Sequence, residues 1–232
     1  MPPKPLATHL LPGEPPVEVT LRRSGRARRL SLRVSGIDGR VTLTCPPRTP
    51  LREALAFLDA RGDWVRGHLA CAEAPAPPAF GGAVPFEGRE LRLCPAPGRR
   101  IVLDGDALLV PEDRMAARLG AWLKMQARGR LTAACDRHAV ALGVSCAALS
   151  LRDPRSRWGS CSAGGRLMFS WRLVMAPSHV LDYVAAHETA HLVRLDHSPA
   201  FWAVVARLRP DWGKSRDWLR AHGASLHRLR LD

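Results

Sequence analysis

Residues 187–191 read His-Glu-Thr-Ala-His, and a third histidine, His197, follows six residues later. Positions i and i+4 of a helix lie on one face, so a helical segment would let His187 and His191 bind one metal ion together. Glu188, next to the first histidine, can then reach a water molecule bound to that metal. The pattern therefore predicts a helix that carries a catalytic metal site.

The third ligand is expected to follow this helix. His197 is the best candidate, because its spacing from His191 matches that of the third histidine in the metzincin motif. That motif has a glycine midway, where this chain has Arg194, so we expect the helix either to end by another kind of turn or to continue for about one more turn. Asp196 is a competing ligand, since carboxylates also bind zinc.

The ligand set indicates which metal and which chemistry to expect. Three nitrogen ligands and one exchangeable water are typical of a catalytic zinc site rather than a closed structural one. Zn²⁺ is the expected ion, and other divalent transition metals suit the same ligands. Zinc lowers the pKa of a bound water to about 7, so the carboxylate of Glu188 is an adequate general base near neutral pH. These features predict a hydrolase.

The 232-residue chain is strongly basic, with 35 Lys and Arg against 21 Asp and Glu and a formal net charge of +14. The arginines are spread along the chain, and only Arg22–Arg29 is dense. This spread favours a solvated basic exterior enlarged by codon bias, and the alternative is an anion-binding surface for nucleic acid or nucleotide phosphates. Scattered cysteines, and no apolar run long enough for a membrane helix, favour a cytoplasmic protein without a membrane partner.

The hydrophobic pattern changes along the chain. The proline-rich residues 1–16 are expected to form a disordered leader, and residues 17–111 a β-rich region with one helix. Residues 112–232 show helical spacing, interrupted by strand-like segments at Ala148–Arg152 and Leu167–Val174. We therefore expect an α+β fold, in which a β-rich N-terminal half with a helix precedes a zincin-like core of helices packed on a small sheet.

Local signals add detail to this outline. Gly36–Gly39 lies between two runs of alternating apolar residues and predicts a hairpin turn. Residues 177–178 open the helix that carries the metal motif, and a final helix is expected to begin at Pro199. Gly129 weakens the prediction of a single helix over residues 113–142.

The metal motif is accompanied by other distinctive blocks. They are His187–His191 followed by Asp196–Trp202, Ser156–Ser162 followed by Trp171–Leu173, and the opening segment Arg28–Val34. Together they resemble the YgjP-like metallopeptidase family, which is related to the SprT-type zinc proteases, over about residues 20–222. The resemblance implies a peptide or protein substrate, the three histidines as ligands and Glu188 as the catalytic group. Thr189 stands where the family usually has leucine, which leaves every chemical position intact.

The tryptophan-glycine block and the last helix supply candidates for substrate binding. Arg157 and Ser160 can line the cleft and donate hydrogen bonds to a substrate backbone or a developing oxyanion. Trp158 and Cys161 are expected instead to pack beneath the metal helix. Trp202 is expected to anchor the last helix to the core, with a place in the pocket wall as the alternative.

The sequence favours hydrolysis of peptide bonds by a zinc-bound water that Glu188 activates. One alternative is a nucleoside triphosphate pyrophosphatase with the same site, since arginine forks fit phosphate oxygens. Another is a nucleic-acid-associated protein with a structural zinc, which would use Arg22–Arg29 although no DNA-reading motif accompanies it. Peptide cleavage, phosphate release and salt-dependent DNA binding distinguish these three functions.

Overall fold

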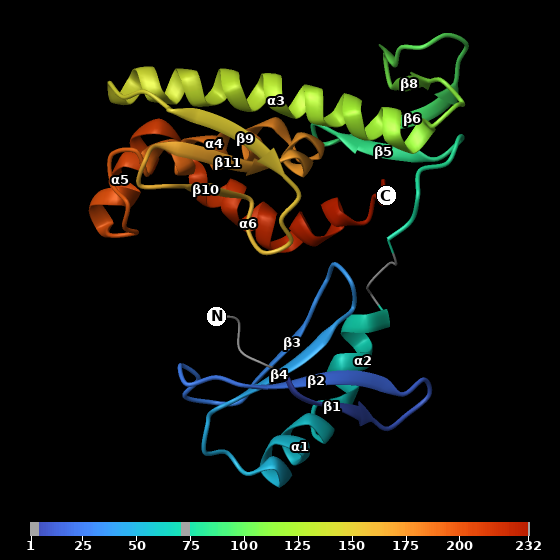
Figure 1. The fold of residues 1–232 in the computed structure, drawn as a ribbon, viewed down its shortest axis with the longest axis vertical. Helices are drawn as coiled ribbons and strands as arrows, with labels where there is room; N and C mark the ends of the chain where they lie inside the picture. Colours follow the sequence, from blue (N-terminus) through green and yellow to red (C-terminus); the bar gives the residue numbers. More distant parts are fainter. Residues whose placement is uncertain (1–4, 71–74, 232) are drawn as a thin grey trace. The chain divides into compact units, whose positions relative to one another are not determined.

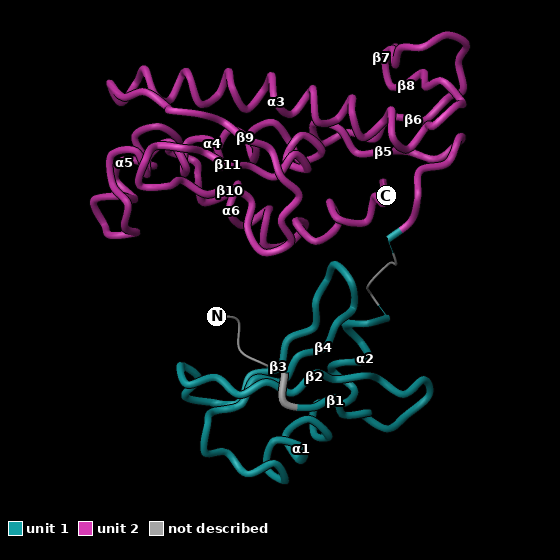
Figure 2. The backbone as a smooth tube through the Cα atoms, viewed as in Figure 1, with its two compact units in different colours: residues 1–75 teal, residues 76–232 magenta. Residues whose placement is uncertain are grey.

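The computed structural model describes residues 5–70 and 75–231, and the chain divides into two compact units. The units are Met1–Pro75 and Ala76–Asp232 (Figure 2). Each unit has its own cluster of buried apolar side chains, so each is held together by a core of its own.

The first unit is a four-stranded sheet with two helices (Figure 1). The sheet order is β1-β2-β4-β3, in which β2 and β4 are parallel and the other pairs are antiparallel. The elements are β1 (Pro5–Leu11), β2 (Val17–Arg23), β3 (Ser31–Val34), β4 (Val41–Cys45), α1 (Leu51–Asp59) and α2 (Gly62–Ala70). The predicted hairpin between β3 and β4 is confirmed by their register and by the φ angle of 66° at Gly39.

The second unit contains a long helix, two small sheets and three further helices (Figure 1). One sheet has the order β5-β6-β8-β7 and the other the order β10-β11-β9. The strands are β5 (Ala83–Phe86), β6 (Arg89–Pro95), β7 (Val102–Asp104), β8 (Ala107–Val110), β9 (Ala148–Arg152), β10 (Gly159–Cys161) and β11 (Arg166–Ser170). The helices are α3 (Met115–Leu142), α4 (Ser178–Ala190), α5 (Pro199–Leu208) and α6 (Trp212–His222), with 3-10 turns at Trp171–Met175 and Gly223–His227. The predicted α+β class is confirmed.

The structure differs from the expected organisation of the chain in two places. We expected a boundary near residue 111, but Leu93 and Val110 before it share one core with Leu119 after it. A small sheet must cover its apolar face with another layer, so these strands belong with the second unit. The expected disordered leader contains strand β1, in which Leu11 is buried. Because β1 is an edge strand, the prolines at its ends are tolerated.

Several elements also differ from their predicted extents. The one helix expected before residue 111 is two, α1 and α2. Helix α3 runs unbroken through Gly129, where a Cβ atom would meet open space. The strand expected over Leu167–Val174 ends at Ser170, whose hydroxyl accepts a hydrogen bond from the Arg172 amide and starts a 3-10 turn. Helix α6 was not predicted. Within the described ranges, no helix has the length and apolar character needed to cross a membrane.

Helix α4 is the central element of the second unit. It packs against α3, α5, α6 and strand β10, and most of its residues are buried. Val180 and Ala185 are fully buried, which is typical of a helix covered on nearly all sides. The helix therefore carries His187 and Glu188 into the interior, where burial and neighbouring side chains determine their chemistry.

Candidate metal centre and catalytic cleft

The metal motif lies at the C-terminal end of α4. His187 and Glu188 are in its last turn, and His191 is the first residue after it. The chain then turns through a hydrogen bond from the Arg194 amide to the carbonyl oxygen of Ala190. Arg194 does not adopt a positive φ angle. Of the two expected outcomes, the helix therefore ends at once by a turn that needs no glycine.

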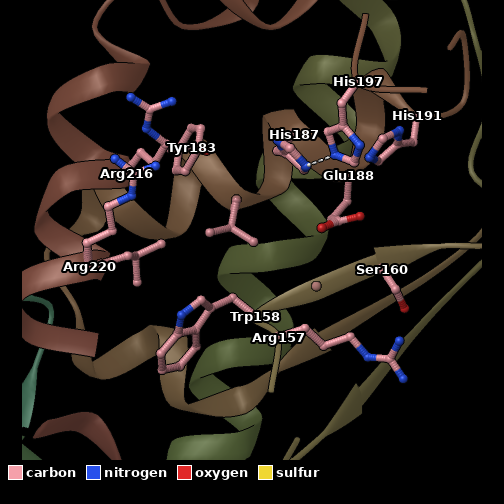
Figure 3. A pocket seen from close by; sticks show the side chains of 13 residues that line it. Arg157, Trp158, Ser160, Tyr183, His187, Glu188, His191, His197, Arg216 and Arg220 are labelled. Carbon is pink, nitrogen blue, oxygen red and sulfur yellow. Dashed lines mark hydrogen bonds between the residues drawn. The ribbon is translucent and has the colours of Figure 1, made fainter. Parts of the chain in front are cut away.

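The three histidine rings converge in front of this turn (Figure 3). One ligand nitrogen from each of His187, His191 and His197 lies within 4.8 Å of the other two. The Nε2 atoms of His187 and His197 are 3.3 Å apart. Two nitrogens on a tetrahedral zinc ion lie about 3.3–3.4 Å apart, given Zn–N bonds of about 2.0–2.1 Å. The donor set therefore fits zinc, and so does the spacing between His187 and His197.

Burial favours the neutral, metal-binding form of the His187 and His191 rings. Burial, followed by the charges of the other two rings, lowers the pKa of His187 to about 4. Burial also lowers the pKa of His191, against the opposing effect of a 2.9 Å hydrogen bond between its Nδ1 and the carbonyl oxygen of Arg194. Because that carbonyl accepts a hydrogen bond, Nδ1 of His191 carries the proton and donates this bond, and Nε2 of the neutral ring keeps a free lone pair.

Asp196, the competing ligand, has a different role. Its Oδ1 accepts hydrogen bonds from the amide of Ser198 at 3.2 Å and from its hydroxyl at 2.8 Å. Ser198 in turn caps α5 by accepting a hydrogen bond from the amide of Phe201. The Asp196 carboxylate therefore fixes the start of α5, and it is not part of the cluster that His197 completes.

Aromatic side chains of α5 pack against the histidine rings. Phe201 stacks on His191 with ring centroids 4.4 Å apart. Trp202 lies 5.6 Å from the ring of His187 and stacks at 4.5 Å on Trp212. Trp202 is absent from the cleft lining within the described part of the chain, so it packs beside the candidate ligand His187 rather than forming a wall of the cleft.

Glu188 is the buried carboxylate of the site, with only 6% of its surface exposed. Burial raises its pKa to about 7, although the positive charge of Arg157 acts in the opposite direction. Gly159 of β10 leaves room for this side chain, because a Cβ atom there would lie 2.6 Å from Oε1 of Glu188. The carboxylate is thus enclosed between α4 and β10.

A cleft of about 510 Å³ lies in front of Glu188 and the histidines (Figure 3). Its walls come from the start of β10, one face of α4 and one face of α6. The lining residues are Arg157, Trp158, Gly159, Ser160, Tyr183, Val184, His187, Glu188, His191, His197, Arg216, Leu219 and Arg220. Arg157 and Ser160 are in the lining, and their binding of a substrate stays a prediction. Trp158 both lines the cleft and packs against the core, whereas Cys161 only packs there.

Sequence reasoning missed the part of the cleft that is remote from the metal motif. Tyr183 stands four residues before His187, and this spacing places it on the same face of α4. The i,i+4 spacing of Tyr183 and His187 could therefore have identified Tyr183 as a cleft residue from the sequence. Arg216 and Arg220 have the same spacing, but they lie on α6, a helix that was not predicted.

The chain matches a known protein family. The family model described as the YgjP-like metallopeptidase domain matches residues 28–222, a range that includes the cleft and parts of both units. No curated protein and no solved structure matches the chain.

Proposed function

The chain belongs to the YgjP-like metallopeptidase family, and on this premise we propose that it is a zinc-dependent peptidase whose active site is the cleft between α4, α6 and β10. His187, His191 and His197 hold the ion, and Glu188 is the general base. One observation carries the proposal: three histidine nitrogens lie within 4.8 Å of one another, and a buried carboxylate borders the same cleft.

The residues of the cleft have separate tasks in this reaction. Zinc, when bound, supplies Lewis-acid polarisation and lowers the pKa of water. Glu188 takes a proton from the attacking water and delivers it to the leaving amine, a task suited to a carboxyl group with a pKa near neutrality. Arg157 and Ser160 donate hydrogen bonds to the substrate from the wall opposite α4.

The strand beside the cleft supports a peptide as the substrate. Strand β10 is at the edge of its sheet, and its residues Gly159 and Ser160 line the cleft. The edge of a sheet offers unpaired backbone groups to which an extended peptide can add as a further strand.

Hydrolysis of nucleoside triphosphates is a second candidate function. The observation that favours it is the presence of Arg157, Arg216 and Arg220 in the cleft lining. Guanidinium groups bind the oxygens of a phosphate through two parallel hydrogen bonds, as they bind the oxygens of a carboxylate. A structural zinc is less consistent with this site, because the histidines border an open cleft rather than a closed cage.

Parallel assays with two substrate classes test the proposal. Zinc-loaded protein is incubated with an unfolded protein substrate and, separately, with nucleoside triphosphates. We expect cleavage of the protein that stops with a chelator, returns with added zinc and is absent from the Glu188→Gln variant. Phosphate or pyrophosphate release without peptide cleavage would favour the second candidate, and inactivity of the zinc-loaded protein on both substrates would reject both.

A further inference from the structure

The α6 wall of the cleft is positively charged. Arg216 and Arg220 lie one turn apart on this helix, and both line the cleft beside Tyr183 (Figure 3). Arg157 adds a third guanidinium, and Glu188 is the one carboxylate in the lining within the described residues. The lining therefore keeps a net positive charge even when Glu188 is ionised.

The two arginines of α6 are weakly paired within the protein. Nη1 of Arg220 is 3.4 Å and Nε of Arg216 is 3.7 Å from Oδ1 of Asp217. Asp217 is 65% exposed and does not line the cleft, so water screens its charge. Within the described ranges, Nε of Arg216 is buried without a hydrogen-bond partner. A buried donor of this kind is stabilised when a ligand supplies an acceptor oxygen.

The position of Arg216 is fixed by aromatic packing. Its guanidinium carbon lies 4.6 Å from the centre of the Trp212 ring, and Trp212 stacks on Trp202 beside the metal ligands. A guanidinium held in this way loses little conformational freedom when it binds a ligand. Arg216 is thus preorganised at a fixed place relative to the histidines.

We propose that the α6 wall is a specificity subsite in which Arg216 and Arg220 bind a carboxylate of the peptide substrate. The planar guanidinium fork matches the two oxygens of a carboxylate. Trp158 and Leu219, which also line the cleft, offer apolar surface to the methylene groups that carry it. This subsite rests on the proposed peptidase function and adds a substrate class, peptides with an acidic side chain or a free C-terminus near the scissile bond.

Equilibrium binding to the zinc-loaded Glu188→Gln protein, which cannot cleave, measures the subsite directly. The probes are acetylated and amidated peptides with Glu at each position in turn, matched peptides with Gln, and Gln peptides with a free C-terminus. We expect one probe to bind about 10-fold more tightly than its neutral match, the effect of one charge-assisted hydrogen bond. A Glu probe identifies a side-chain carboxylate, and the unamidated probe identifies the chain terminus.

Matched variants separate the subsite from general charge effects. Arg216→Gln and Arg220→Gln should each remove most of the preference. Lys214→Gln removes the same charge from an exposed position of the same helix outside the cleft, and it should keep the preference. Arg220→Glu should reverse the preference toward a Lys probe, a gain that a poorly folded variant cannot show.

The outcomes that overturn each proposal are different. Equal binding of Glu, Gln and unamidated probes, or an unchanged preference in the Arg216 and Arg220 variants, overturns the subsite. Wild-type cleavage of neutral and acidic peptides with equal kcat/KM also overturns it and leaves the peptidase intact. Carboxylate-selective binding without cleavage of any peptide supports the subsite and overturns the peptidase.

Discussion

Two cavities in the described part of the second unit have volumes of about 510 Å³ each, and they differ in how far their charged groups are paired. We call the cavity beside α3 the ion-pair pocket, and its charged lining residues are Glu87, Arg130, Arg137, Asp182 and Arg209. There the carboxylates are paired with arginines. In the cleft that we propose as the active site, Nδ1 of His187 and Nε of Arg216 are buried without hydrogen-bond partners among the described residues.

Asp182 in the ion-pair pocket has several hydrogen-bond partners. Its carboxylate accepts hydrogen bonds from Arg137 at 2.9 Å, from His138 at 3.1 Å and from Arg209 at 2.7 Å. It therefore joins α3, α4 and the end of α5. Unsatisfied buried groups cost stability, whereas satisfied networks contribute to it. We infer that the ion-pair pocket stabilises the unit and that the cleft gives up stability for function.

The largest expected effect is that of Glu188→Gln on catalysis. Loss of a general base typically costs about 10²–10⁴-fold, so we expect kcat for peptides to fall by about 10³-fold. Zinc content should be unchanged and the urea midpoint near neutral pH should not fall, since the amide occupies the same volume and has no charge to bury.

Glu87→Gln is the matched control, because it makes the same chemical change in the ion-pair pocket. It should lower stability, through loss of the Arg130 pair, and leave kcat unchanged. The contrast between the two cavities breaks down if Glu188→Gln retains turnover or if Glu87→Gln abolishes it.

Asp182→Asn should have the next largest effect, on stability rather than activity. Removing one partner of a largely buried ion pair leaves Arg209 and His138 poorly satisfied, and we expect a loss of about 3 kcal/mol. Urea unfolding followed by tryptophan fluorescence measures it, because six of the seven tryptophans lie after residue 75. Stability equal to that of the wild type would show that the ion-pair pocket is not a structural network.

Helices α4 and α6, which both line the cleft, differ in how well the sequence predicts them. Helix α4 and the candidate ligands His187 and His191 could be predicted from local periodicity and from i,i+4 spacing, which act within a few turns of chain. Helix α6 has few apolar residues and follows Pro210, so its own sequence indicates it poorly and packing stabilises it. The charged wall with Arg216 and Arg220 was missed for that reason.

Contacts between segments that are far apart in the sequence could not be predicted from local sequence patterns either. Gly159 lies against Glu188 although 29 residues separate them, and only the packing of β10 on α4 brings them together. The strands up to residue 111 were assigned to the wrong side of a boundary for the same reason: strand periodicity does not say which helix will cover the sheet.

Gly159→Ala should reduce activity with little effect on the fold. Its Cβ atom would lie 2.6 Å from both Cγ and Oε1 of Glu188, so the carboxylate must move. A displacement of about 1 Å at a catalytic group costs about 10²-fold in rate. Gly164→Ala is the control, since a Cβ atom there meets nothing within 4 Å. Wild-type kcat in Gly159→Ala would mean that the position of Glu188 in the cleft is not critical.

The smallest expected effect is a dependence of stability on pH that comes from the ion-pair pocket. Burial alone would raise the pKa of Asp182, but the hydrogen bond from His138 and the charges of His138 and Arg209 outweigh it and lower the pKa to about 2. An unfolded Asp has a pKa of about 3.9, so the ionised form stabilises the folded state above this value. That stabilisation is lost as the pH falls from about 4 to about 2.

Wild type and Asp182→Asn should therefore become more alike in acid. The difference between their free energies of unfolding should shrink by about 2 kcal/mol between pH 5 and pH 2, because only the wild type carries the carboxylate that titrates. Urea titrations at pH steps across this range measure the difference. A constant difference would mean that packing, rather than the charge of Asp182, sets the stability of the pocket, and the contrast with the catalytic cleft would then lie in shape instead of in pairing.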